Sequence, residues 1–188
     1  MSINANSLWC VLVATTLLGA CNNASDPKPT DDNEAITTAT LTLTSQTTPV
    51  QTVTATVENL NTNADFSRAT LTLRPNTTYT GAVTLLDKTK TPTLDVSAEV
   101  KKEANEHFFV YTFTPAASSP ASMTVTSTDR DTNPAPGPFP LGLATQVRTG
   151  AAGSGKLKVV LRHQPNAKNG TATPGTTDLD TDFSVVTQ

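Results

Sequence analysis

The sequence predicts an all-β fold, arranged as an antiparallel sandwich of two sheets with one short helix. Threonine supplies 37 of the 188 residues, and this β-branched residue favours strands over helices. Hydrophobic residues alternate with threonine through most of the chain, which is the period of a strand with one buried face. Turn-forming residues separate the alternating runs, so that eight or nine short strands fit an immunoglobulin-like β-sandwich.

The first twenty residues are typical of an export signal. They carry no charged side chain and contain an apolar run of eleven residues, Leu8 to Leu18. That run is too short to cross about 30 Å of hydrocarbon, but it fits the hydrophobic core of a signal peptide. It leads into Leu18-Gly19-Ala20-Cys21, which resembles the bacterial lipobox. We therefore expect residues 1–20 to be a lipoprotein signal peptide, with an ordinary secretory signal or a short buried helix as the alternatives.

The lipobox determines what the two cysteines are expected to do. Cys10 is removed with the leader, and Cys21 becomes the lipidated N-terminus that anchors the protein in a membrane. Asn22 follows the cysteine, and the absence of Asp at this position favours the outer membrane. Residues 21–35 are polar with two prolines, which predicts that the lipidated cysteine begins a disordered linker.

Alternation from Ile36 onward predicts a single β-sandwich domain over residues 36–188. The expected strands cover residues 40–44, 52–57, 70–73, 78–86, 107–113, 123–127, 143–149, 157–163 and 177–186. Asp95 to Glu106 breaks the period: it starts with an N-cap residue and places Val96 and Val100 four apart. This segment predicts a short helix, with a strand over 94–100 as the alternative.

Composition and motifs favour a binding protein over an enzyme. A net charge of −3 provides no basic surface for nucleic acid. Gly150 to Lys156 matches the first part of a phosphate-binding loop, but Leu157 replaces the hydroxyl residue and a strand follows, so we expect a hairpin turn. No nucleophile or acid–base pair stands out, and the predicted function is non-enzymatic.

Two acidic segments are candidate metal ligands. Asp129 and Asp131 resemble the start of a calcium loop, but Pro134 and Pro140 occupy the positions that need Gly and Glu. Asp178, Asp180 and Asp182 alternate, which predicts that all three face the same side of an edge strand. Both segments have a simpler interpretation as solvated, charged surface.

The two histidines are the stronger lead. His107 opens one predicted strand and His163 closes another, and each shares a face with hydrophobic residues. If each connection after residue 107 reverses the chain, both histidines gather at one end with Asp129, Asp131 and Asp178. Imidazole and carboxylate together are typical zinc ligands, whereas carboxylates alone suit calcium. The alternative is that each histidine caps a strand at the margin of the core.

Several segments resemble small Bacteroidota lipoproteins. They are the lipobox, residues 36–44, 76–86, 106–109, 129–131 with 140–143, 161–165 and 177–180. Such proteins are labelled "type 1 periplasmic binding fold superfamily protein", a label that implies two α/β lobes, and are similar to accessory lipoproteins of outer-membrane uptake systems. The length and period of this chain predict a β-sandwich instead.

The sequence thus predicts an outer-membrane lipoprotein that captures a divalent metal, with zinc favoured and calcium as the alternative. The predicted ligands are His107, His163, Asp129, Asp131 and Asp178. An outer-membrane receptor or another envelope protein is the expected partner. The competing hypothesis is a structural or adhesion module that binds a protein or glycan.

Overall fold

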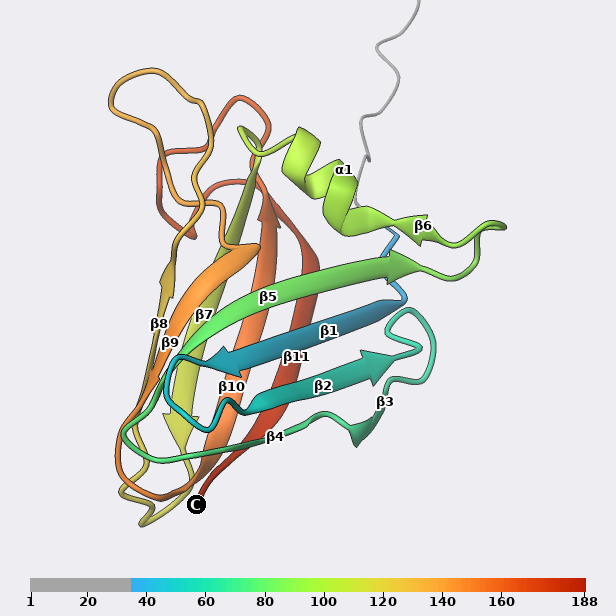
Figure 1. Ribbon diagram of the computed structural model, residues 1–188. Coiled ribbons are helices and arrows are strands. Elements are labelled where there is room, and N and C mark those ends of the chain that lie inside the picture. The colour runs from blue at the N-terminus through green and yellow to red at the C-terminus, as the bar shows by residue number, and fades with distance from the viewer. Residues whose placement is uncertain (1–34) are drawn as a thin grey trace, which may run out of the picture. The chain divides into compact units, whose positions relative to one another are not determined.

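The computed structural model describes residues 35–188, which belong to one compact unit. The predicted signal peptide, Cys21 and all of the linker except Ala35 lie outside the described residues. Two β-sheets pack face to face (Figure 1), and a cluster of buried hydrophobic side chains fills the space between them. The predicted all-β sandwich is confirmed, and the narrower immunoglobulin-like assignment stays a prediction. No helix among the described residues is long and apolar enough to cross a membrane.

The larger sheet has seven strands in the order β3-β2-β1-β5-β9-β8, with β6 paired to β5. They are β1 (Thr38–Ser45), β2 (Thr52–Glu58), β3 (Asp65–Arg68), β5 (Thr78–Asp87), β6 (Leu94–Asp95), β8 (Met123–Ser127) and β9 (Ala144–Thr149). The expected strands include neither β3 nor β6, because both are very short and every one of their residues is exposed; the alternative strand over 94–100 overlaps β6 only at its first two residues. Neither strand therefore shows the alternation that marks a buried face.

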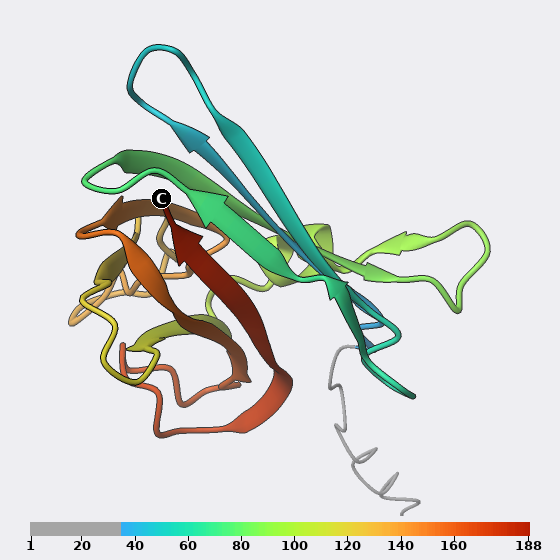
Figure 2. The ribbon, with the colours of Figure 1, turned by 90° about the horizontal axis from the view of Figure 1, so that it is seen from below.

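The smaller sheet has four strands in the order β4-β11-β10-β7. They are β4 (Thr70–Leu73), β7 (His107–Pro115), β10 (Gly153–His163) and β11 (Thr176–Thr187). The prediction of purely antiparallel pairing is wrong at one edge, because β4 runs parallel to β11 (Figure 2). The chain leaves the larger sheet at the end of β3 and enters the smaller one directly as β4, without a hairpin between paired strands. A turn at Gly150 joins β9 to β10 as expected, but it is not the predicted hairpin, because the two strands belong to different sheets and do not pair.

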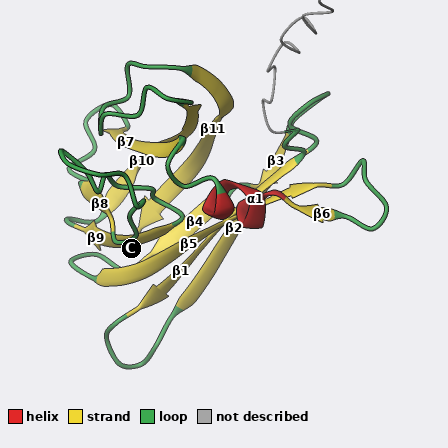
Figure 3. Ribbon diagram, turned by 90° about the horizontal axis from the view of Figure 1, so that it is seen from above, coloured by secondary structure: helices red, strands yellow, loops and turns green. Residues whose placement is uncertain are grey.

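The predicted short helix is confirmed. Helix α1 (Val96–Lys102) buries Val96 and Val100, and the Asp95 carboxylate accepts a hydrogen bond from the Ala98 amide. It lies against β5, where the Leu85 amide donates to Ser97 Oγ at 2.6 Å (Figure 3). The next four residues, 103–106, form a turn rather than more helix and lead into β7.

Threonine lines the outer face of β1 and β2, as the alternation predicts. Three cross-strand pairs of hydroxyl groups lie within 3.1–3.2 Å: Thr40 with Thr56, Thr42 with Thr54, and Thr44 with Thr52. The intervening leucines of β1 are fully buried in the core. Threonine suits this face because its β-branched side chain favours the strand conformation, while its hydroxyl group pairs across the strands and contacts solvent.

Candidate metal centre

One end of the sandwich collects the polar connections, as the predicted strand directions require. The turn 103–106, the loop 128–143 and the loop 164–175 lie together at the upper end in Figure 1. Side chains tie these three connections to one another. The Lys168 ammonium donates to the Ala104 carbonyl at 2.8 Å, and the Thr132 amide donates to Asn105 Oδ1 at 2.9 Å.

His107 and His163 face each other across the ladder between β7 and β10. The antiparallel register pairs the two residues directly, and both side chains point into the sandwich with the core residues of their strands. Their rings stack with centroids 4.8 Å apart and planes 9° from parallel. The sequence prediction that the two histidines meet is therefore confirmed.

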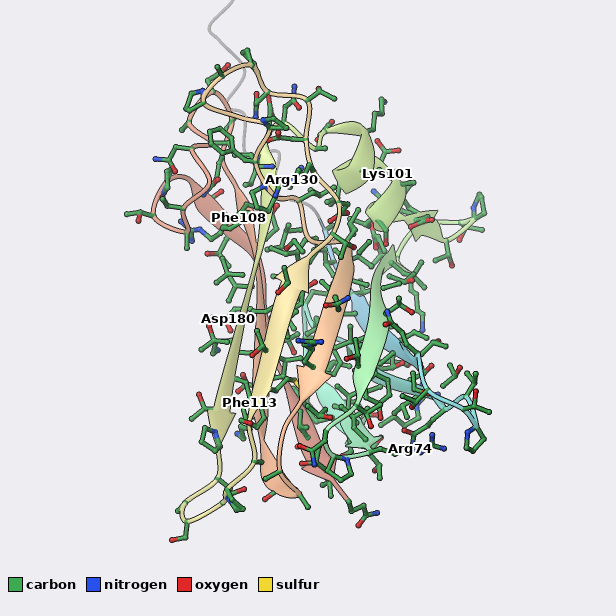
Figure 4. All side chains as sticks on the ribbon, turned by 60° about the vertical axis from the view of Figure 1, so that its left-hand side comes forward. Arg74, Lys101, Phe108, Phe113, Arg130 and Asp180 are labelled. Atoms are coloured by element: carbon green, nitrogen blue, oxygen red, sulfur yellow. The ribbon has the colours of Figure 1, made fainter. Side chains whose placement is uncertain are left out.

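A bulge in β11 brings Asp178 to the same place. Leu161 pairs with Leu179 and Arg162 pairs with Thr177, so Asp178 is the extra residue on its strand. The prediction that Asp178 shares a face with Asp180 and Asp182 is wrong, because the bulge turns Asp178 inward. The other two acids remain on the outer face, where Lys158 contacts both, and Figure 4 shows Asp180 pointing away from the sandwich.

The Asp178 carboxylate is buried without hydrogen bonds. Its side chain is 0 % exposed, and neither of its oxygens has a hydrogen-bond partner among the described residues. The nearest polar contact is His107 Nε2, 3.5 Å from Oδ2 and equally buried. A carboxylate in this environment is costly unless a cation compensates its charge.

Together, His107, His163 and Asp178 can hold a metal ion. One potential ligand atom from each residue lies within 4.8 Å of the others. His107 Nδ1 lies 3.2 Å from the Glu103 carbonyl, the kind of contact that fixes the tautomer and leaves Nε2 as the ligand atom. His163 Nε2 lies 3.6 Å from Glu106 Oε2, and the Glu106 side chain is 40 % exposed.

The structure does not bring Asp129 or Asp131 into this group, although both lie at the predicted end. Asp129 accepts hydrogen bonds from the Gly142 and Ala144 amides at 2.7 and 3.1 Å. The strands on either side of the 128–143 loop, β8 and β9, belong to the larger sheet, whereas the two histidines belong to the smaller one. Counting chain reversals predicts which end of the sandwich a loop reaches, but not which sheet its strands join. The carboxylate of Asp129 therefore holds its own loop in place.

Asp131 forms a buried ion pair instead of a metal site. It accepts a bond from Lys168 Nζ at 3.0 Å, and both side chains are at most 1 % exposed. Burial by itself would raise the pKa of Asp131, but hydrogen bonds from Lys168, the Phe139 amide and Asn133 outweigh it and hold the pKa below its usual value. The pair joins the 128–143 loop to the 164–175 loop.

Gly175 allows the chain to approach His163 closely before β11 begins. It has a positive φ of 76°, and a Cβ atom there would lie 1.8 Å from the His163 carbonyl oxygen. Only glycine fits both conditions without displacing the backbone. The close approach of Gly175 to the His163 carbonyl fixes where β11 begins, two residues before the bulge at Asp178.

Sequence reasoning left two residues of this end out of its candidates. Glu106 directly precedes His107, which places it at the same end of the sandwich, but it was not among the predicted ligands. Lys168 lies in a loop, where no periodicity indicates the position of a side chain. Comparison with known proteins adds no ligand or partner, since no family model, curated protein or solved structure matches this chain.

Proposed function

We propose that this protein captures a divalent metal ion, zinc, through His107, His163 and Asp178. The observation that carries the proposal is the Asp178 carboxylate, which is fully buried, accepts no hydrogen bond from residues 35–188 and lies beside two stacked imidazoles. A bound cation offsets the cost of burying this charge. Metal binding thus accounts for a group that folding alone does not favour.

The ligand atoms favour zinc over calcium. Calcium binds through oxygen ligands, whereas two of the three residues here offer imidazole nitrogen. The distance of 3.5 Å between His107 Nε2 and Asp178 Oδ2 is long for a hydrogen bond. It matches the separation of about 3.3–3.6 Å between neighbouring ligands of a tetrahedral zinc ion with bonds of about 2.0–2.2 Å.

The proposed setting is the outer membrane, with lipid on Cys21 as the anchor. The support is the Leu18-Gly19-Ala20-Cys21 lipobox after an apolar leader. The domain then acts as a non-enzymatic accessory that concentrates metal for an uptake receptor. Detergent-phase partition of the protein from cells checks the anchor: Cys21→Ser should move the protein to the aqueous phase, and unchanged partition rules the lipid out.

Zinc titration by calorimetry tests the metal site. Chelator-treated protein should bind one zinc ion saturably, and Asp178→Asn should weaken that binding by at least tenfold, because it removes the only carboxylate of the three-residue group. Asp180→Asn is the matched control, since Asp180 lies on the same strand but faces solvent. It should bind as the unaltered protein does.

Two outcomes would contradict zinc capture. One is the absence of saturable binding to the unaltered protein. The other is equal binding by the Asp178→Asn and Asp180→Asn variants, which would place the ion elsewhere on the surface. His163→Gln is a second check from the neighbouring strand, and it should weaken zinc binding as Asp178→Asn does.

A second candidate function is an adhesion module that binds through the threonine surface of β1 and β2. The supporting observation is the row of hydroxyl pairs on that face, which is free of charged residues between Thr40 and Thr44. Pull-down from envelope extract compares the unaltered protein with a Thr42→Lys/Thr54→Lys variant. A partner that the variant no longer retains supports this function, and recovery of no partner by either protein argues against it.

A further inference from the structure

We propose that Glu106 is the exchangeable fourth ligand of the metal, through which the ion enters and leaves. This inference rests on the proposed metal site and adds how that site is loaded and emptied. His107, His163 and Asp178 provide three ligands, and zinc in proteins takes four. Whether the fourth position is filled by a protein side chain decides how tightly the ion is retained.

Glu106 lies beside His163 but outside the group of three, and an inward turn of its side chain would make it a fourth ligand. Its Oε2 lies 3.6 Å from His163 Nε2, too far for a good hydrogen bond. A similar distance, 3.5 Å, separates His107 Nε2 from Asp178 Oδ2. Each imidazole thus has a carboxylate at about the distance that two ligands keep on one zinc ion. Two carboxylates would also balance the charge of a divalent cation.

Exposure distinguishes Glu106 from the other three residues. The side chains of His107 and Asp178 are 0 % exposed and that of His163 is 8 % exposed, whereas Glu106 is 40 % exposed. Glu106 also borders a hollow of about 290 Å³ lined by Asn105, Asn133, Asn166, Ala167 and Lys168. Of the four residues, Glu106 is therefore the one whose side chain can turn to solvent without unpacking the core.

Local anchoring permits this motion. The Glu106 backbone is held, since its carbonyl accepts from the Gln164 amide at 2.6 Å and its amide donates to the Glu103 carbonyl at 2.9 Å. The side chain has several rotatable bonds beyond that fixed point. An incoming hydrated ion first meets the exposed carboxylate, which then delivers it to the buried ligands. The reverse motion opens one coordination position to solvent or to a competing ligand.

Zinc release measured with an excess of chelator tests the proposal. Glu106→Gln should lower zinc affinity by about ten- to a hundredfold, mainly through faster release, because one charged ligand is lost while the buried three remain. Glu103→Gln is the matched control, since it removes a neighbouring charge and leaves in place the Glu103 carbonyl that lies beside His107 Nδ1. Its release rate should equal that of the unaltered protein.

Cobalt replaces zinc in a second measurement that a merely structural role for Glu106 would not affect. Visible absorption of bound Co²⁺ reports its coordination number, and Glu106→Gln should change the spectrum whereas Glu103→Gln should not. Release and spectra identical to those of the unaltered protein would overturn the role of Glu106 while leaving the three-residue site intact. No saturable binding by the unaltered protein would instead overturn the metal site and this inference together.

Discussion

At the scale of single residues, the buried Asp178 carboxylate is the feature that most favours a metal site. Polar groups in a folded interior are nearly always hydrogen-bonded, and the exceptions need an explanation. Several buried polar atoms of residues 35–188 are exceptions, and among them Asp178 is the carboxylate in which both oxygens are buried without a hydrogen bond. A residue kept for ligand binding, at a cost to the unliganded fold, is expected to show this pattern.

The cost of Asp178 can be measured in metal-free protein. Asp178→Asn removes the buried charge and keeps the shape, so the free energy of unfolding without metal should rise by about 1–3 kcal/mol. Urea denaturation of chelator-treated protein gives this value. A fall in stability would mean that Asp178 is a structural partner of His107, and that the pair does not await a metal.

The buried pair of Asp131 and Lys168 should behave in the opposite way. Lys168→Met leaves the Asp131 carboxylate without its cation, and the free energy of unfolding should drop by about 3–5 kcal/mol. A double variant with Asp131→Asn should recover part of the loss. If urea denaturation gives the same stability for the single variant and the unaltered protein, the pair contributes nothing to the fold.

The Asp131 pair also sets a pH dependence. The pKa of Asp131 is lower in the folded protein than in the unfolded chain, so its contribution to stability is complete above about pH 4, the ordinary Asp pKa. That contribution is lost as the pH falls further, through the folded pKa. Denaturation midpoints between neutral and acid pH should therefore fall less in an Asp131→Asn variant than in the unaltered protein.

At the scale of elements, the bulge in β11 decides which acids face inward. The extra residue breaks alternation between Thr177 and Leu179, so Asp178 joins the core face and Asp180 stays outside. Bulges often redirect a side chain next to a functional site. The two-residue period was right on both sides of the bulge, and the bulge itself has no sequence signal.

Deletion of Thr177 tests the role of the bulge. With one residue fewer, β11 can pair with β10 by regular alternation, and Asp178 should turn to the outer face. Zinc binding should be lost while the circular dichroism spectrum still shows a folded β protein. Retention of tight zinc binding by the folded deletion variant would show that the bulge does not position the ligand.

At the scale of the whole molecule, metal binding should stabilise the fold. The three ligands come from β7, β10 and β11, which are neighbours in the smaller sheet. Zinc at about a hundred times its dissociation constant should add about 2.7 kcal/mol to the free energy of unfolding. Scanning calorimetry should show a higher Tm for the unaltered protein, but not for His107→Gln/His163→Gln. An equal rise in both would indicate nonspecific binding.

The sequence predicted the sandwich and the meeting of His107 with His163 because both depend on strand period and direction. Strand period and direction can be read from consecutive residues of the sequence. It could not assign the β8–β9 hairpin to the other sheet, and so it counted Asp129 and Asp131 as ligands. Sheet membership depends on long-range packing, which a single sequence does not display.

The cross-strand position of the two histidines also has a kinetic consequence. They form the last pair in the ladder between β7 and β10, and the bond from the Gln164 amide to the Glu106 carbonyl continues it by one step. The end of a ladder frays more often than its middle. A metal ion that joins His107 to His163 holds this end of the ladder closed, so hydrogen exchange at the Gln164 amide should be slower in the zinc-bound protein than in the metal-free protein.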